Sequence, residues 1–136
     1  MTLVLDANVV LAACTRDDGF ADFGTEVLVA PPLMWSEFLS GLREGVWRGE
    51  RTADEAEVDL AAFRAAPVRM RTHPKLLDEA WRMASTFGWA KTYDAEYVAL
   101  AALLGGTLIT LDVRLRRGTD RLGYVLTPPE WVERSG

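Results

Sequence analysis

Residues 2–8 read Thr2-Leu3-Val4-Leu5-Asp6-Ala7-Asn8, and this stretch decides the fold. Residues 2–5 form a short apolar run, of the length and composition typical of a buried strand. Residues 7–14 follow as a predicted helix, with Asp6 in the position of its cap. A buried strand that leads directly into a helix is typical of α/β folds, in which helices cover both faces of a parallel sheet.

The alternation of short apolar runs and helical patterns continues along the chain. Pro31 and Pro32 suit a helix start, because proline is tolerated in the first turn. Thr52 and Glu55 form a capping box, and Gly88 suits a helix end. Strands are predicted over residues 2–5, 26–30, 68–71, 107–111 and 123–126, and helices over residues 7–14, 33–46, 52–66, 74–87, 92–104 and 128–134. The pattern predicts an α/β fold with a parallel β-sheet flanked by α-helices.

Length and composition fit a single domain over residues 1–136, with 49% hydrophobic residues available for a core. No apolar segment is long and charge-free enough to span a bilayer, and the first residues lack the basic start of a signal peptide. Cys14 is the only cysteine, so an intrachain disulfide is excluded. His73, the only histidine, precedes a proline and is interpreted as structural or solvated. We therefore expect a cytoplasmic protein without a membrane partner.

Four carboxylates stand beside apolar runs, where a charge is costly unless a partner compensates it. They are Asp6, Glu37, Asp94 and Asp112. Ligands of parallel sheets bind beyond the carboxyl ends of the strands, so we expect the four side chains to meet there. Acids in one cleft repel each other and raise each other's pKa, and Mg²⁺ or Mn²⁺ is the usual remedy. The pattern therefore favours metal-assisted phosphate chemistry.

Each acid also has a structural explanation. Asp6 suits a helix cap, and Asp94 suits the dipole of the helix that it begins. Glu37 is free to face solvent, and Asp112 suits a turn paired with Arg114.

Three small polar residues lie two positions from one of these acids, and they suit a supporting shell that orients carboxylates or bound water. They are Asn8, Thr92 and Thr110. Their structural alternatives are a first-turn helix residue for Asn8, a helix cap for Thr92 and an ordinary strand position for Thr110.

The net charge is −5, whereas the footprint of a nucleic-acid binder is usually basic. A bound cation would reverse that sign locally. Arg114, Arg116 and Arg117 form a basic stretch directly after Asp112. They are the candidates for RNA binding, with a solvated surface as the alternative.

Four segments resemble, in order, a PIN domain, and specifically the VapC-type ribonuclease toxins of type II toxin–antitoxin pairs. They are Leu3-Val4-Leu5-Asp6-Ala7-Asn8, Ser36-Glu37, Thr92-Tyr93-Asp94-Ala95-Glu96-Tyr97-Val98-Ala99-Leu100-Ala101 and Leu108-Ile109-Thr110-Leu111-Asp112. The third segment is the most specific, and together the four cover nearly the whole chain.

The resemblance implies a PIN-like parallel sheet of about five strands between helices. It also implies that Asp6, Glu37, Asp94 and Asp112 are catalytic and hold one or two Mg²⁺ or Mn²⁺ ions. The implied partners are an RNA substrate, a cognate antitoxin and a second copy of the chain in a homodimer.

The expected reaction is metal-dependent hydrolysis of an RNA phosphodiester, in which the carboxylates are ligands and one accepts the proton of the attacking water. One alternative is a Mg²⁺-dependent phosphatase or phosphotransferase with Asp6 as covalent nucleophile. A haloacid-dehalogenase-like enzyme of that kind would have a second aspartate where Asn8 stands. The other alternative is a catalytically weak PIN-like binding module whose acids receive an Arg-rich partner.

Overall fold

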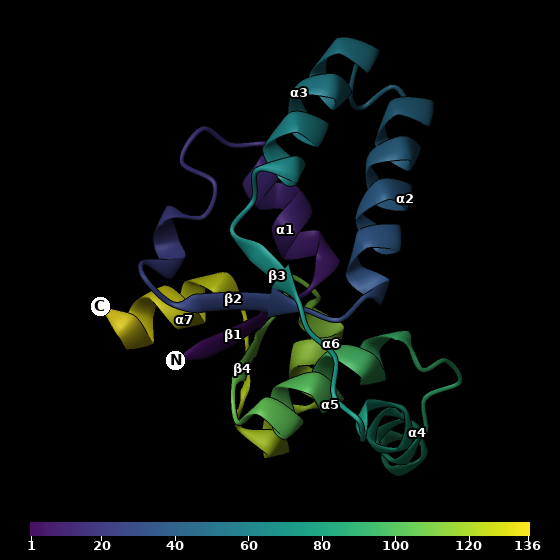
Figure 1. The fold of residues 1–136 in the computed structure, drawn as a ribbon. Helices are drawn as coiled ribbons and strands as arrows, with labels where there is room; N and C mark the ends of the chain where they lie inside the picture. Colours follow the sequence, from purple (N-terminus) through teal and green to yellow (C-terminus); the bar gives the residue numbers. More distant parts are fainter.

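The protein is described over residues 1–136 by a computed structural model. Five parallel strands form one sheet in the order β3-β2-β1-β4-β5, which confirms the predicted α/β fold (Figure 1). The central strand β1 pairs with β2 on one side and with β4 on the other. The strands are β1 (Thr2–Leu5), β2 (Val27–Ala30), β3 (Val68–Met70), β4 (Thr107–Ile109) and β5 (Val125–Leu126).

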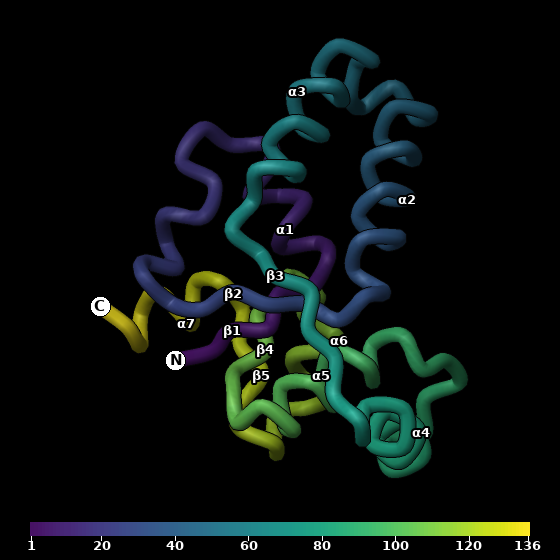
Figure 2. Tube along the Cα trace, viewed as in Figure 1, coloured from purple at the N-terminus to yellow at the C-terminus, as the bar shows by residue number.

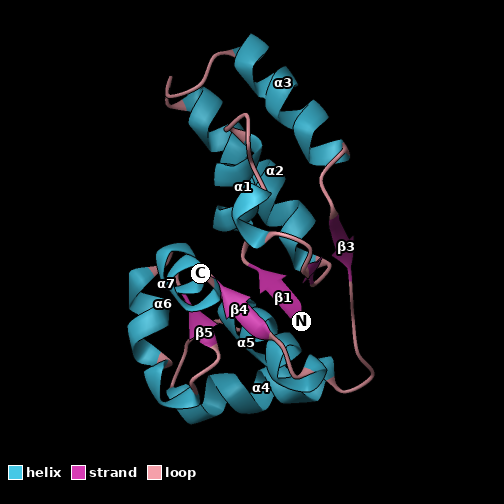
Figure 3. Ribbon diagram, turned by 90° about the vertical axis from the view of Figure 1, so that its left-hand side faces the viewer, coloured by secondary structure: helices cyan, strands magenta, loops and turns pink.

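The helices fall into two groups around this sheet. In Figures 1 and 3, α1, α2 and α3 lie to one side of the strands, whereas α4 and α5 lie to the other. None of the helices combines the length and the apolar character needed to cross a bilayer. The helices are α1 (Ala7–Cys14), α2 (Leu33–Trp47), α3 (Ala53–Arg64), α4 (Leu76–Phe87), α5 (Tyr93–Leu104), α6 (Val113–Gly118) and α7 (Pro128–Ser135), with short 3₁₀ turns at Ala21–Phe23 and Asp120–Leu122.

Helix α5 runs through the interior next to β1 and β4. Residues 97–101 of this helix are completely buried, as are Leu3, Val4 and Leu5 of β1. Apolar residues surround the helix rather than forming one stripe, as expected for a helix inside the core. This packing fixes the position of the first turn of α5, which carries Asp94.

Helices α2 and α3 form a hairpin that projects away from the sheet (Figure 1). The rings of Phe38 and Phe63 stack between them, with centroids 3.7 Å apart. The predicted capping box is confirmed, because Thr52 accepts a hydrogen bond from the Glu55 amide. Stacking and capping together stabilise the hairpin beyond the edge of the sheet.

The crevice for a ligand follows from the strand order. The chain runs outward from β1 to β2 and β3 on one side, and from β4 to β5 on the other. Strands β1 and β4 are therefore the neighbours at which the direction of winding reverses, and parallel sheets bind ligands beyond the carboxyl ends of such a pair. Asp6 follows β1 directly, and Thr110 follows β4.

Two local features of the helices differ from expectation. Helix α6 was not predicted, because six residues are too few to show a helical period. The spacing of Leu77, Ala80, Trp81 and Ala84 predicts one apolar face of α4, yet Leu77 and Trp81 are exposed, and the buried face consists of Leu76, Ala80, Met83 and Ala84. Most of the tryptophans lie in the core or pack against it, and the two that are open to solvent are Trp47 and Trp81.

Candidate active site

Asp6 lies at the carboxyl end of β1, in the crevice beside β4. Its side chain is only 7% exposed, and one carboxylate oxygen (Oδ2) accepts a hydrogen bond from the Thr110 hydroxyl at 2.8 Å. The Asn8 amide donates a longer bond of 3.4 Å to the same oxygen. Asp6 occupies the cap position of α1, but its side chain makes no capping hydrogen bond. The carboxylate therefore faces Thr110 and Asn8 and does not cap the start of α1.

The surroundings of Asp6 oppose its negative charge. The pKa of this carboxyl is raised from 3.8 to about 7, mainly by burial and to a lesser extent by the charges of Asp94 and Glu37, although the Thr110 hydrogen bond acts in the opposite direction. No arginine or lysine forms an ion pair with Asp6. A buried carboxylate with acidic neighbours and no cation is the arrangement that a bound metal ion would relieve.

A further hydrogen bond joins the segments that follow β1 and β4, and another lies within the turn after β4. The Leu111 amide donates to the Asn8 side-chain oxygen at 3.1 Å, and the Asp112 amide donates to the Thr110 hydroxyl at 3.0 Å. The Thr110 hydroxyl thus accepts a hydrogen bond from the Asp112 amide, in its own turn after β4, and donates one to Asp6, which follows β1. These bonds fix the two turns, and with them the separation of Asp6 and Asp112.

Glu37 reaches the site from the second turn of α2. Its carboxylate accepts a hydrogen bond of 2.6 Å from the hydroxyl of Tyr97, whose side chain is completely buried in α5. Burial raises the pKa of Glu37, the Tyr97 bond lowers it, and the charge of Asp94 raises it again. Tyr97 therefore holds Glu37 from inside the core, and its own pKa is raised by burial and by that bond.

Asp94 and Asp112 form the outer part of the site. The Asp94 side chain is open to solvent, yet the surrounding protein and the charge of Asp112 raise its pKa. Both residues line a pocket of about 440 Å³ with Trp89 and Arg114. One oxygen of Asp112 (Oδ1) caps α6 by accepting from the amides of Arg114 and Leu115, at 3.0 and 3.1 Å. The other oxygen accepts no hydrogen bond from the protein.

The four acids interact electrostatically as a group. Asp94 raises the pKa of Asp6 and of Glu37, and Asp112 raises the pKa of Asp94. None of the four forms an ion pair. No three of the side chains lie close enough to enclose one metal ion together. Their carboxylate oxygens are nonetheless the donors that Mg²⁺ and Mn²⁺ prefer, so the donor chemistry and the uncompensated charge fit such an ion.

Some of the other predicted site residues contact the acids, and others do not. Asn8 and Thr110 contact Asp6, whereas Thr92 makes no side-chain capping bond and lines a neighbouring pocket. Arg116 forms ion pairs with Glu130 and Asp120, so its guanidinium is used inside the protein, which argues against its predicted RNA contact. Arg114 and Arg117 are exposed and outside the ion pairs.

Two residues near the acids were not identified from the sequence. Tyr97 was interpreted only as part of an apolar run, although a tyrosine on a buried helix face needs a partner for its hydroxyl. Glu96 is half-buried, and the charge of Glu37 raises its pKa. A glutamate beside the first apolar residues of a helix gave no signal that separates it from an ordinary surface acid.

Comparison with known proteins agrees with this geometry. The profile of the PIN domain family matches residues 3–120. VapC ribonuclease Mb0985 of Mycobacterium bovis is 33% identical over 114 residues, which cover 83% of this chain and 87% of the relative. Ribonuclease VapC9 of Mycobacterium tuberculosis matches with the same identity and coverage.

Among solved structures, the crystal structure of PAE2754 from Pyrobaculum aerophilum superposes with a TM-score of 0.75. The match covers 98% of this chain and 88% of that chain at 21% sequence identity, and it shows a shared fold. The chain therefore belongs to the PIN domain family, and its similarity to the mycobacterial relatives places it among the VapC-type members.

Proposed function

We propose that this protein is a metal-dependent endoribonuclease, the toxin of a VapBC-type toxin–antitoxin pair, with Asp6, Glu37, Asp94 and Asp112 as its catalytic carboxylates. The observation that carries the proposal is the burial of the Asp6 carboxylate beside other acids, with no basic side chain paired to it. Membership of the PIN family and similarity to proteins named VapC ribonucleases support the choice of RNA as substrate.

The four carboxylates would hold one or two Mg²⁺ or Mn²⁺ ions. Such an ion, when bound, lowers the pKa of water and neutralises charge on the phosphate. The chain's own residues position the carboxylates and accept the proton. Thr110 and Tyr97 keep the carboxylates of Asp6 and Glu37 in place, and one carboxylate of the group accepts the proton that the attacking water loses.

Arg114 lines the pocket of Asp94 and Asp112, and Arg117 follows it on α6. Both carry exposed positive charges, so we assign them to the phosphates of the RNA backbone. They compensate locally for the net charge of −5.

The proposal includes a cognate antitoxin, a homodimer and a cytoplasmic location. Apolar side chains that are exposed on the α2–α3 hairpin support a protein partner, because such residues are normally covered in a complex. They are Leu39, Trp47 and Val58.

The decisive experiment is cleavage of a mixed RNA pool by the purified wild-type and Asp6→Asn proteins, each with Mg²⁺, Mn²⁺ or EDTA. Cleavage by the wild type alone, abolished by EDTA, is the expected result. Equal cleavage by both proteins would indicate a contaminating nuclease. If neither cleaves RNA, calorimetry with Mn²⁺ follows, and the absence of binding at millimolar levels would favour the binding module. Hydrolysis of small phosphate esters instead of RNA would favour the phosphatase alternative.

A further inference from the structure

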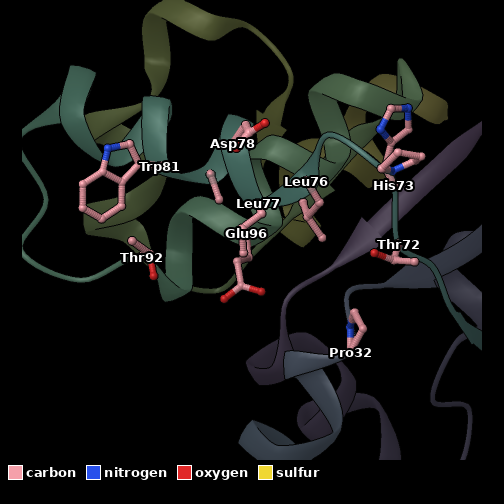
Figure 4. Close-up of a pocket in the computed structure, with 11 residues that line it drawn as sticks. Pro32, Thr72, His73, Leu76, Leu77, Asp78, Trp81, Thr92 and Glu96 are labelled. Carbon is pink, nitrogen blue, oxygen red and sulfur yellow. The ribbon is translucent and has the colours of Figure 1, made fainter.

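A second pocket, of about 600 Å³, lies beside the acidic site (Figure 4). It is bounded by the start of α2, by helices α4 and α5, and by the segment that runs from β3 to α4 (Figure 2). Its size lies within the range of about 300–1,000 Å³ typical of small-molecule sites. The proposed hydrolysis of a phosphodiester makes no use of this pocket.

The pocket and the acidic site share the first turn of α5. Thr92 and Glu96 line the pocket, and Asp94 lies between them in the sequence and lines the acidic site. The charge of Glu37 also raises the pKa of Glu96, so the two carboxylates lie near each other. A polymer whose phosphate lies at the acidic site would therefore bring the next unit along its chain to this pocket.

Two rings stand at the ends of the pocket. Figure 4 shows the Trp81 ring at one end and the His73 ring at the other, with Glu96 between them. Trp81 is 71% exposed and takes part in no aromatic pair, and the backbone amide of Lys75 donates to His73 at 3.0 Å, which fixes the imidazole. His73 is half-buried, whereas the exposed ring of Trp81 is the kind of surface on which proteins stack unpaired bases.

The acids of the pocket indicate which part of a nucleotide enters. Glu96 and Asp78 line it, and neither forms an ion pair or a side-chain hydrogen bond. Two carboxylates repel a phosphate but accept hydrogen bonds from the N–H groups of a base. Guanine presents two adjacent donors to a carboxylate on its Watson–Crick edge, whereas adenine and cytosine present one amino group and uracil one ring N–H. The exposed, unpaired cations Arg71 and Lys75 flank the lining segment and suit the phosphates outside.

We propose that this pocket binds one unpaired base of the RNA beside the cleaved bond, with Trp81 as the stacking surface and Glu96 as the hydrogen-bond acceptor that favours guanine. The proposal rests on the ribonuclease function and adds to it a base preference. Trp81 and Glu96 are specificity residues in this scheme, because neither lies among the four carboxylates.

The test is a binding titration in EDTA, so that no RNA is cleaved during the measurement. The probes are single-stranded tetranucleotides that contain one guanine, adenine, cytosine or uracil in an otherwise constant sequence. Wild-type protein is expected to bind the guanine probe at least about fivefold more tightly than the uracil probe, since a good bidentate contact gives discrimination of this order or more. The fluorescence anisotropy of dye-labelled probes reports the binding, so the signal does not depend on Trp81.

Three variants separate stacking from hydrogen bonding. Trp81→Ala is expected to weaken the binding of all four probes by about tenfold, because the stacking surface is lost. Glu96→Gln is expected to abolish the preference for guanine and to leave the uracil probe within about threefold of wild type. Val132→Ala is the control, since Val132 is an exposed apolar residue of α7 outside the pocket, and its loss is expected to change no affinity.

The pocket proposal is overturned if Trp81→Ala and Val132→Ala bind all probes alike, or if Glu96→Gln keeps the wild-type preference. It is also overturned if Trp81→Ala leaves the affinity for RNA unchanged and converts a dimer to a monomer in sedimentation, because this face would then be a contact between two copies of the chain. These results would leave metal-dependent RNA cleavage intact. A wild-type protein that cleaves no RNA would instead contradict the proposed function, whereas the titration in EDTA would still decide on base binding.

Discussion

Asp6 and Asp59 are both buried aspartates, with exposures of 7% and 2%, but only one of them has a cation beside it. Both oxygens of Asp59 accept hydrogen bonds from the guanidinium of Arg51, at 2.7 to 3.0 Å, and the pair lies within the α2–α3 hairpin. Asp6 accepts only from the neutral side chains of Thr110 and Asn8. The first charge is compensated within the chain. The charge of Asp6 has no such partner, and the proposed metal ion would supply the missing cation.

The largest expected effect is on cleavage. Asp6→Asn is expected to reduce metal-dependent RNA cleavage by about 10³-fold, because a metal ligand and its charge are lost. Asp59→Asn, measured at a temperature where it is folded, is expected to cleave within a few-fold of wild type. A gel assay of both variants on one RNA pool tests the contrast. Comparable losses in both would mean that Asp6 has no special role.

The pH dependence of stability should separate the two acids next. In the unfolded chain Asp6 loses its proton near its ordinary pKa of 3.8, whereas in the folded protein it does so at about 7. The folded state therefore holds the extra proton between these values, and the metal-free protein should lose as much as about 4 kcal/mol of unfolding free energy as the pH rises from 4 to 7. Urea denaturation at several pH values measures this, and Asp6→Asn should show a flatter profile. Addition of Mg²⁺ at pH 7 should restore stability, and a flat wild-type profile would contradict the burial argument.

Opposite stability changes should follow from the same chemical substitution at the two aspartates. Asp59→Asn leaves the Arg51 charge without its main partner and should cost about 3 kcal/mol, at the lower end of the usual range because Arg51 remains partly exposed and keeps Glu55. Asp6→Asn removes an uncompensated charge and should leave the metal-free protein at pH 7 at least as stable as wild type. Thermal and urea unfolding of both variants provide the measurement. A loss of stability in Asp6→Asn similar to that of Asp59→Asn would remove the distinction.

Tyr97 offers a smaller and more local test. Tyr97→Phe removes the hydroxyl that holds Glu37 and is expected to weaken Mn²⁺ binding by about tenfold, the lower end of the effect for residues that orient metal ligands. Calorimetry measures this without reference to cleavage. Tyr124→Phe is the matched control, because the Tyr124 hydroxyl is buried and has no hydrogen-bond partner. Equal metal affinity in both variants would show that Tyr97 has no positioning role.

The smallest effect is expected at the arginines after Asp112. The double variant Arg114→Ala/Arg117→Ala should weaken RNA binding a few-fold and reduce the slope of log affinity against log salt concentration by about 2. Arg116→Ala should leave that slope nearly unchanged and lower the melting temperature, because Arg116 joins α6 to Glu130 of α7 and holds the pKa of that carboxyl at about 2. If Arg116→Ala changes the slope as much as the double variant, the division among the arginines is wrong.

Sequence reasoning was most successful where one element determines the outcome. The strand over residues 2–5, the helix over residues 7–14 and the capping box at Thr52 follow from local patterns, and all three are confirmed. The exposure of Trp81 could not be predicted from the sequence, because apolar residues occupy adjacent positions along α4. Only the packing of α4 against α5 selects the face that is buried.

The candidate site shows the same limit. The convergence of Asp6 and Asp112 follows from parallel strands that end at one edge. The Tyr97–Glu37 bond and the ion pair between Arg116 and Glu130 join residues that are 60 and 14 positions apart, so they depend on how helices pack rather than on any local signal. The pocket beside α5 is likewise formed by four separate segments, none of which is unusual alone.

The central position of β1 has a consequence for synthesis on the ribosome. This strand is made first, yet one of its two neighbours is β4, about a hundred residues later, and the Asp6 amide bonds to Ile109 of that strand. A nascent chain that stops before residue 107 has no partner for that edge of β1, lacks Thr110 beside Asp6, and lacks the fourth carboxylate. Translation products that stop before β4 are thus expected to be inert, and any toxicity requires a chain that extends through Asp112.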